Sequence, residues 1–104
     1  MAEEQRQPGS GTLEETRAAT KRPTLYKVVL HNDDYTTMAF VVQVLETVFL
    51  RPPAEAYRVM MQVHVQGRGV CGLYPLEIAE TKVVTVHELA REHGFPLRAS
   101  LEEE

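Results

Sequence analysis

The sequence has one cysteine, Cys71, and fewer basic than acidic residues, 11 Lys and Arg against 15 Asp and Glu, for a formal net charge of -4. A single cysteine cannot form a disulfide within the chain, and a reducing compartment suits it. Phosphate binding needs a basic patch, which the sequence lacks, so we expect no nucleic-acid partner. No apolar run is long enough to cross a bilayer, so we expect no membrane partner either.

The beginning of the chain lacks the apolar segment of a signal peptide and has almost no large apolar side chains. We therefore expect a cytoplasmic protein. Residues 1–24 cannot bury enough surface to offset the entropy lost on ordering, which predicts a flexible N-terminal extension. Residues 25–104 have an ordinary apolar content and suffice for one domain.

The apolar pattern of the first half of this domain predicts a strand and two helices. Leu25 to His31 alternates as a strand does, and the short polar residues that follow favour a turn. A helix begins after Thr36 or Thr37, either of which can cap it. Its predicted core stripe is Met38, Val41, Val42, Leu45, Val48 and Phe49. A second helix begins at Pro53, which suits a first helical turn.

The second half predicts two strands on either side of a third helix. The apolar run from Val70 to Tyr74 indicates a central strand, and a helix begins after Pro75. The predicted core stripe of this helix is Leu76, Ala79, Val83, Val86 and Ala90. Its β-branched residues favour a strand, but the stripe extends over about four turns, which favours a helix. With a last strand from Leu97 to Leu101, the order predicts an α+β domain, a three-stranded antiparallel sheet packed on three helices.

Residues that could carry catalysis are scarce. Ser10 and Ser100 lack the strand-turn-helix setting of a nucleophilic serine, and no glycine pattern fits a phosphate loop. Asp33 and Asp34 are adjacent and lack the glycine of a calcium loop, and no two histidines have the spacing of metal ligands. We therefore expect no catalytic residue, no metal site and no cofactor.

Taken alone, the polar residues have ordinary structural interpretations. Residues 32–34 suit a turn and a helix cap. His64 lies on a helical stripe beside Met60 and Met61, where a histidine is most often part of the core. These interpretations leave the function open.

Four segments together resemble the ClpS family of Clp protease adaptors. They are Asn32-Asp33-Asp34-Tyr35-Thr36, His64 with Gln66-Gly67, Cys71-Gly72, and Ala79-Glu80-Thr81-Lys82-Val83. They occur in the order and spacing of the family, and the resemblance extends from Leu25 to Glu103. An isolated Asn-Asp-Asp is common, but the combination is highly specific. The resemblance implies a compact α+β fold similar to the C-terminal domain of the ribosomal stalk protein.

The resemblance implies an adaptor, not an enzyme, that captures proteins bearing an N-terminal Phe, Tyr, Trp or Leu, an N-degron. The positions that match the binding site of the free α-amino group are Asn32, Asp33, Asp34 and His64. The positions that match the hydrophobic pocket are Thr36, Met38, Val41, Met60, Val63 and Leu97. Met38 also matches a gatekeeping position that disfavours Ile and Val.

The resemblance further implies delivery to the ClpP protease. Glu77 and Lys82 match positions that dock on the N-terminal domain of a ClpA- or ClpC-type unfoldase, and the N-terminal extension matches a segment that engages it. We expect a monomer. One departure is Thr37, where the family commonly has a proline that would stiffen the helix start. We expect a looser helix start here, which leaves the side-chain selectivity open but does not affect binding itself.

Two other functions remain possible from the residues alone. The first is a stalk-like interaction domain, which would bind a partner through its helices and has no need of Asn32, Asp34 and His64 together. The second is a small metal-dependent enzyme that uses His31, Asp33, Asp34 and His64.

Overall fold

The computed structural model describes residues 23–104, which form the predicted α+β fold. The elements in chain order are β2 (Leu25–His31), α2 (Met38–Thr47), α3 (Pro53–Gln66), β3 (Arg68–Pro75), α4 (Leu76–Glu92) and β4 (Arg98–Glu103). The predicted order of strands and helices is therefore confirmed. Most of the predicted N-terminal extension, residues 1–22, lies outside the described residues. None of the helices within 23–104 is long and apolar enough to span a bilayer.

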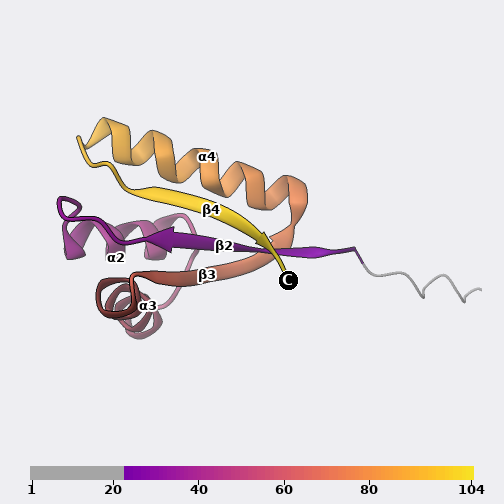
Figure 1. Cartoon of the computed structure of the whole chain (residues 1–104), viewed down its shortest axis with the longest axis horizontal. Coiled ribbons are helices and arrows are strands. Elements are labelled where there is room, and N and C mark those ends of the chain that lie inside the picture. The colour runs from indigo at the N-terminus through magenta and orange to yellow at the C-terminus, as the bar shows by residue number, and fades with distance from the viewer. Residues whose placement is uncertain (1–22) are drawn as a thin grey trace, which may run out of the picture.

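The central strand of the sheet is β2, and the strand order is β3-β2-β4 with both pairs antiparallel (Figure 1). The prediction that the Val70–Tyr74 segment is central is wrong, because β3 lies at an edge. Val28, Val29 and Leu30 of β2 are completely buried.

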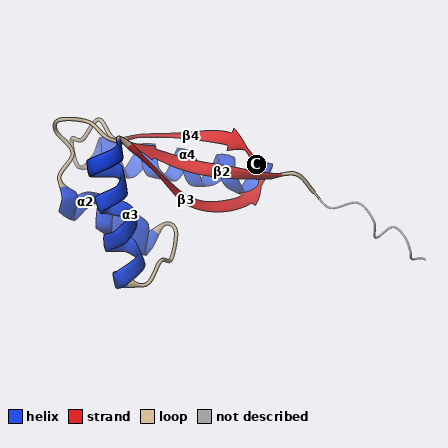
Figure 2. Ribbon diagram, turned by 60° about the horizontal axis from the view of Figure 1, so that its bottom comes forward, coloured by secondary structure: helices blue, strands red, loops and turns tan. Residues whose placement is uncertain are grey.

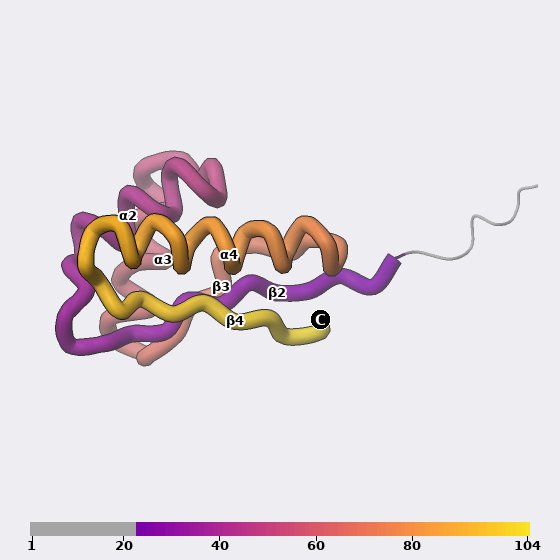
Figure 3. Tube along the Cα trace, turned by 90° about the horizontal axis from the view of Figure 1, so that it is seen from above, coloured from indigo at the N-terminus to yellow at the C-terminus, as the bar shows by residue number. Residues whose placement is uncertain are grey.

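The three helices pack on the sheet in two groups. The long α4 runs along the sheet and contacts all three strands (Figures 1 and 3). Helices α2 and α3 pack against each other near the C-terminal end of β2, as Figure 2 shows. The core lies between the helices and the side chains of Val28 and Leu30.

The predicted helical stripes are partly wrong. Met38 and Leu76, predicted to be in the core, are 45% and 41% exposed. Both are the first residues of their helices, where the chain has only just turned toward the core. Val44, which was not predicted, is completely buried, because α2 packs against α3 and its buried stripe is shifted accordingly.

Helix α4 forms although its sequence is rich in β-branched residues. The hydroxyl groups of Thr81 and Thr85 donate hydrogen bonds of 3.0 and 2.8 Å to carbonyl oxygens one helical turn earlier. Val86 and Ala90 are buried in the core. Burial of one helical face therefore outweighs the local preference for a strand.

Residues at the ends of the helices satisfy free backbone groups. The hydroxyl of Thr37 caps α2 by accepting a hydrogen bond of 3.1 Å from the N–H of Phe40. Gly67 ends α3 with a φ of 91°, a left-handed conformation that favours glycine. After α2, Leu50 has a φ of 54° and is the one non-glycine residue within 23–104 with a positive φ.

The sheet also has an open face, made of the strand side chains that point away from the helices. Alternation along β2 places Val29 and His31 on it. Arg68 of β3 and Glu102 of β4 form an ion pair on this face with an N–O distance of 2.5 Å. The pair spans the central strand, and the strand register places Val29 beneath it. This cover accounts for the complete burial of Val29 on an otherwise open face.

Candidate functional site

A cavity of about 250 Å³ lies beyond the C-terminal end of β2. Its lining residues are Asn32, Asp33, Asp34, Thr36, Met38, Val41, Met60, Val63 and His64. They come from the loop after β2, from α2 and from α3. Every one of them is a position that the resemblance implied. The fold therefore brings the loop after β2 together with residues of α2 and α3 that are distant from it in the sequence.

The floor of this cavity is apolar. Val41, Met60 and Val63 line it and are 6%, 4% and 2% exposed. Met38, at the first turn of α2, is 45% exposed and forms the lip. A cavity of this size is smaller than the pockets that hold drug-sized ligands, and it suits a single side chain.

The polar residues of the cavity lie at its rim. Asn32, Asp34 and His64 are exposed. The backbone N–H of Asn32 donates a hydrogen bond of 2.9 Å to the carbonyl oxygen of Gly67, which joins the end of β2 to the end of α3. This bond brings the Asn32 and His64 segments together. An amide oxygen, a carboxylate and an imidazole nitrogen together offer hydrogen-bond acceptors to a cationic group.

Asp33 organises the loop that carries the rim. One carboxylate oxygen accepts hydrogen bonds from the backbone N–H groups of Tyr35 and Thr36, at 2.8 and 2.7 Å. The other accepts a bond of 2.7 Å from the hydroxyl of Thr36. Burial raises the pKa of Asp33, but these three bonds outweigh it and the pKa is lowered on balance. Both oxygens are engaged with the loop itself, so Asp33 acts as a positioning residue for Asn32 and Asp34.

Thr37 provides a second support for the lip. Its hydroxyl caps α2 directly before Met38. A proline here would have restricted the backbone, whereas threonine supplies a hydrogen bond to the helix start. Threonine therefore supports the start of α2 by a hydrogen bond in place of the backbone restriction that proline gives.

Leu97, which the resemblance implied for the pocket, is not among the residues that line this cavity. It is 4% exposed and belongs to the core cluster. It lies directly before β4, where an apolar side chain on the helix side of the sheet points into the core.

Of the four residues of the hypothetical metal enzyme, His31 lies apart from the other three. His31 lies on the open face, where its Nε2 is 2.6 Å from the hydroxyl of Ser100. Asp33 is engaged by its own loop, and Asp34 and His64 remain at the rim. Within residues 23–104, no three His, Cys, Asp or Glu side chains are grouped as metal ligands.

Cys71 is buried in the core beneath the sheet. Burial raises the pKa of its thiol to about 12, despite a backbone hydrogen bond and the charge of Arg51, which lower it. The thiol stays protonated at neutral pH and is a poor nucleophile, in keeping with a structural role.

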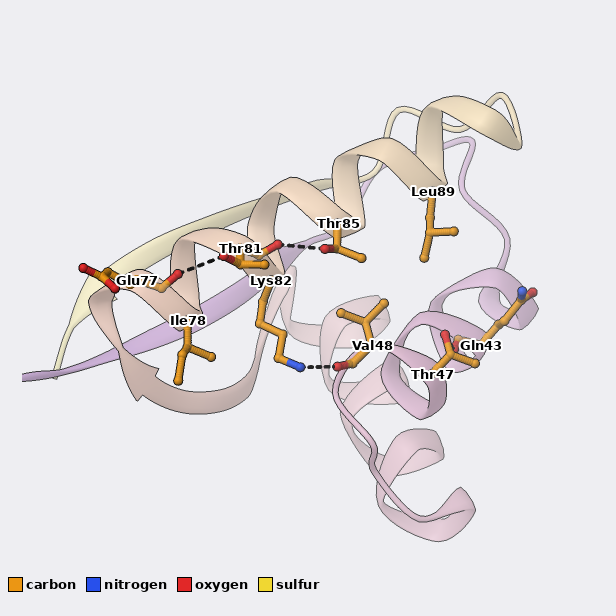
Figure 4. Close-up of a pocket in the computed structure, with 9 residues that line it drawn as sticks. All are labelled: Gln43, Thr47, Val48, Glu77, Ile78, Thr81, Lys82, Thr85 and Leu89. Carbon is orange, nitrogen blue, oxygen red and sulfur yellow. Dashed lines mark hydrogen bonds between the residues drawn. The ribbon is translucent and has the colours of Figure 1, made fainter.

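A second cavity, of about 800 Å³, lies between α2 and α4 and is called the α2–α4 groove (Figure 4). Its lining residues are Gln43, Thr47, Val48, Glu77, Ile78, Thr81, Lys82, Thr85 and Leu89. The groove brings together Glu77 and Lys82, the two positions implied for partner docking. Ile78 was not predicted to be functional, yet it is 48% exposed in the groove, and sequence alone offered no signal for it.

Glu77 and Lys82 differ in their surroundings and do not pair with each other. The ammonium of Lys82 donates a hydrogen bond of 2.7 Å to the carbonyl oxygen of Val48 (Figure 4). It also lies 5.5 Å from the centre of the Tyr74 ring. Glu77 is exposed in the first turn of α4. These two positions thus supply one exposed carboxylate and one half-buried ammonium that joins α4 to the end of α2.

Comparison with known proteins identifies relatives over most of the chain. The family described as ATP-dependent Clp protease adaptor protein ClpS matches residues 21–100. The ATP-dependent Clp protease adapter protein ClpS of Desulforapulum autotrophicum is 60% identical over 82 residues, which are 79% of this chain and 79% of that protein. The ClpS adapter of Desulfotalea psychrophila is 48% identical over 104 residues, 100% of each chain.

A solved structure has a similar fold. It is the structure of Agrobacterium tumefaciens ClpS2 bound to L-phenylalaninamide, with a TM-score of 0.76 and 46% sequence identity. The match covers 80% of this chain and 100% of that chain. The likeness therefore extends over the domain that contains both cavities.

Proposed function

Because the chain belongs to the ClpS family of ATP-dependent Clp protease adaptors, we propose that it captures proteins by an N-terminal Phe, Tyr, Trp or Leu and delivers them to a ClpA- or ClpC-type unfoldase with ClpP. The observation that carries this proposal is the cavity with an apolar floor of Val41, Met60 and Val63 beneath a rim of hydrogen-bond acceptors. One part fits an apolar side chain, and the other fits a free α-amino group.

The rim recognises the amino terminus. An α-ammonium group has only donors, and it needs acceptors around it. The Asp34 carboxylate supplies charge, the Asn32 amide supplies an oxygen, and neutral His64 supplies a ring nitrogen. An acetyl group on the amine would remove the charge and two donors, and these acceptors would be left unpaired. Recognition of this kind rejects internal protein segments, which have no free amine.

The floor recognises the first side chain. Full burial of a large apolar side chain contributes roughly 1.5–3 kcal/mol. Met38 and Met60 are flexible enough to fit both a flat ring and a branched Leu. The ligand of the similar Agrobacterium protein, L-phenylalaninamide, has a free α-amino group, an aromatic side chain and an amide where a polypeptide would continue. The cavity of about 250 Å³ in this chain suits the same kind of aromatic side chain.

Delivery requires a surface that remains accessible while the pocket is occupied. The α2–α4 groove is lined by none of the residues that line the pocket. In this proposal Glu77 contacts the N-terminal domain of the unfoldase and Lys82 maintains the shape of the groove. The protein acts in the cytoplasm as a monomer, and the protease performs all covalent chemistry.

The proposal is tested by fluorescence anisotropy with a labelled peptide that begins with Phe, beside versions that begin with Leu, Ala and N-acetyl-Phe. The free Phe and Leu peptides should bind, and the Ala and acetylated peptides should bind at least tenfold more weakly. Asn32→Ala should reduce binding of the Phe peptide, whereas Gln62→Ala, on a face of α3 that does not line the cavity, should not. Equal binding of the acetylated peptide would contradict amino-terminal recognition and would favour a stalk-like interaction domain.

A further inference from the structure

Two arginines and a histidine lie in one row across the open face of the sheet. The strand register pairs His31 of β2 with Arg68 of β3 on one side and with Arg98 of β4 on the other. Neighbouring strands are about 5 Å apart, so the row extends about 10 Å across the sheet. Helix α4 lies on one face of the sheet (Figures 2 and 3), and the alternation along β2 places His31 on the other face. We call these three residues the basic row.

The charges of the basic row are unequal. Arg98 is exposed and has no ion pair within residues 23–104. Arg68 is 48% exposed and shares its charge with Glu102. The pKa of His31 is lowered by burial and then by Arg98 and Arg68, so this histidine is neutral near pH 7. The free positive charge of the row therefore belongs to Arg98, with a smaller contribution from Arg68.

The basic row lies at the end of β2 that leads into the rim of the candidate pocket. His31 precedes the rim residue Asn32 in the chain. Arg68 follows Gly67, whose carbonyl oxygen holds the backbone N–H of Asn32. An extended polypeptide advances about 3.3 Å per residue. If its first residue occupies the pocket, its third to fifth residues come within reach of the row.

We propose that Arg98 and Arg68 form a subsite for acidic side chains near the third to fifth positions of the captured polypeptide. The occupant is the same chain whose first residue fills the pocket, so this inference rests on the proposed function. Carboxylates complement the guanidinium groups in charge and in hydrogen-bonding geometry. Asp33 and Asp34 near the pocket would repel an acidic segment, and the arginines offset that repulsion. The pocket recognises only the first residue of the polypeptide. The subsite adds selectivity for the residues that follow it.

The experiment compares three peptides of equal length by fluorescence anisotropy with the full chain. They begin Phe-Ala-Glu-Glu-Glu, Phe-Ala-Gln-Gln-Gln and Phe-Ala-Lys-Lys-Lys. The glutamate peptide should bind about two- to fivefold more tightly than its isosteric glutamine counterpart, as expected for exposed charge pairs, and the lysine peptide should bind more weakly. The advantage of glutamate should shrink in about 0.5 M salt, since exposed charges are screened.

Three variants test which residues cause the preference for the glutamate peptide. In each variant, the preference is measured as the ratio of the affinities for the glutamate and glutamine peptides. Arg98→Gln should reduce the ratio close to one. Glu102→Gln releases Arg68 from its partner and should raise the ratio. Arg91→Gln removes an exposed charge from the last turn of α4, away from the sheet, and should leave the ratio unchanged.

The proposal is overturned if wild-type protein binds the glutamate peptide no better than the glutamine peptide. It is also overturned if Arg98→Gln and Arg91→Gln give the same ratio. A gain from glutamate in peptides that begin with Ala would show an anion site independent of the pocket and would equally overturn it. Failure of the glutamine peptide to bind at all would instead overturn the proposed function, and the subsite with it.

Discussion

Lys82 joins α4 to the end of α2 through a hydrogen bond of 2.7 Å from its ammonium to the carbonyl oxygen of Val48. Lys82→Met keeps the apolar stem but loses this bond, and it leaves a half-buried carbonyl group without its partner. We expect the free energy of unfolding to fall by about 1–2 kcal/mol, which urea denaturation can measure. Glu77→Gln, which changes an exposed side chain in the same groove, should leave stability unchanged. Equal stability of the two variants would show that Lys82 is not a positioning residue.

Asp33 holds the loop of the pocket through three hydrogen bonds from Tyr35 and Thr36. Asp33→Ala should weaken binding of a Phe peptide by about tenfold, because the rim residues Asn32 and Asp34 lose their fixed positions. Asp33→Asn keeps an oxygen that can accept both backbone bonds, and it should restore most of the affinity. If Asn is as damaging as Ala, the charge of Asp33 acts on the peptide directly.

The lowered pKa of His31 predicts that the folded protein is less stable in mild acid than at neutral pH. Its pKa is lowered below the ordinary value of 6.5 by burial and by the charges of Arg98 and Arg68. Between the lowered pKa and 6.5 the unfolded chain binds the proton better than the folded chain, so stability falls as the pH falls through this window. Above it, His31 is neutral in both states and the effect vanishes.

The measurement for His31 is the midpoint of urea unfolding at about pH 7.5 and about pH 5.5. The midpoint should fall with pH in the wild-type protein and should fall less in His31→Gln. His93→Gln, a change at an exposed histidine after α4, serves as the control. A fall in His31→Gln as large as that of the wild type would place the acid sensitivity elsewhere.

Leu50 occupies a left-handed backbone conformation that costs a side-chain-bearing residue energy. Its φ is 54° and its side chain is 76% exposed, so little packing is at stake. Leu50→Gly should raise the free energy of unfolding by up to about 1 kcal/mol. The reverse change at Gly67, Gly67→Ala at a φ of 91°, should lower it by about the same amount. A less stable Leu50→Gly protein would mean that the exposed leucine makes contacts that hold the loop.

Much of the local structure could be predicted from the sequence. Pro53 begins α3, Gly67 ends it, and the β2 strand has its predicted bounds. Thr37, one of two predicted caps, forms the capping bond of α2. These features depend on neighbouring residues alone, through backbone conformation and hydrogen bonds within one helical turn.

The pocket residues were predicted by resemblance and not by local pattern. On local grounds His64 suited the core, and Asn32 to Asp34 suited an ordinary turn. The fold places them around one cavity because the bond between Asn32 and Gly67 joins two segments that are distant in sequence. Leu97 was the exception, since its burial in the core depends on the direction in which the chain enters β4.

The sequence by itself determined where the helices and strands lie, their order, and the residues that match the family. Only the tertiary structure decided that β2 is central, that Lys82 is tied to Val48, and that His87 accepts the backbone N–H of Ala99. It also placed His31 between two arginines. The physical reason is that hydrophobic periodicity reports which side of an element is buried but not which partner buries it. Strand order and polar contacts are settled only when distant segments meet and each buried donor or acceptor must find a partner.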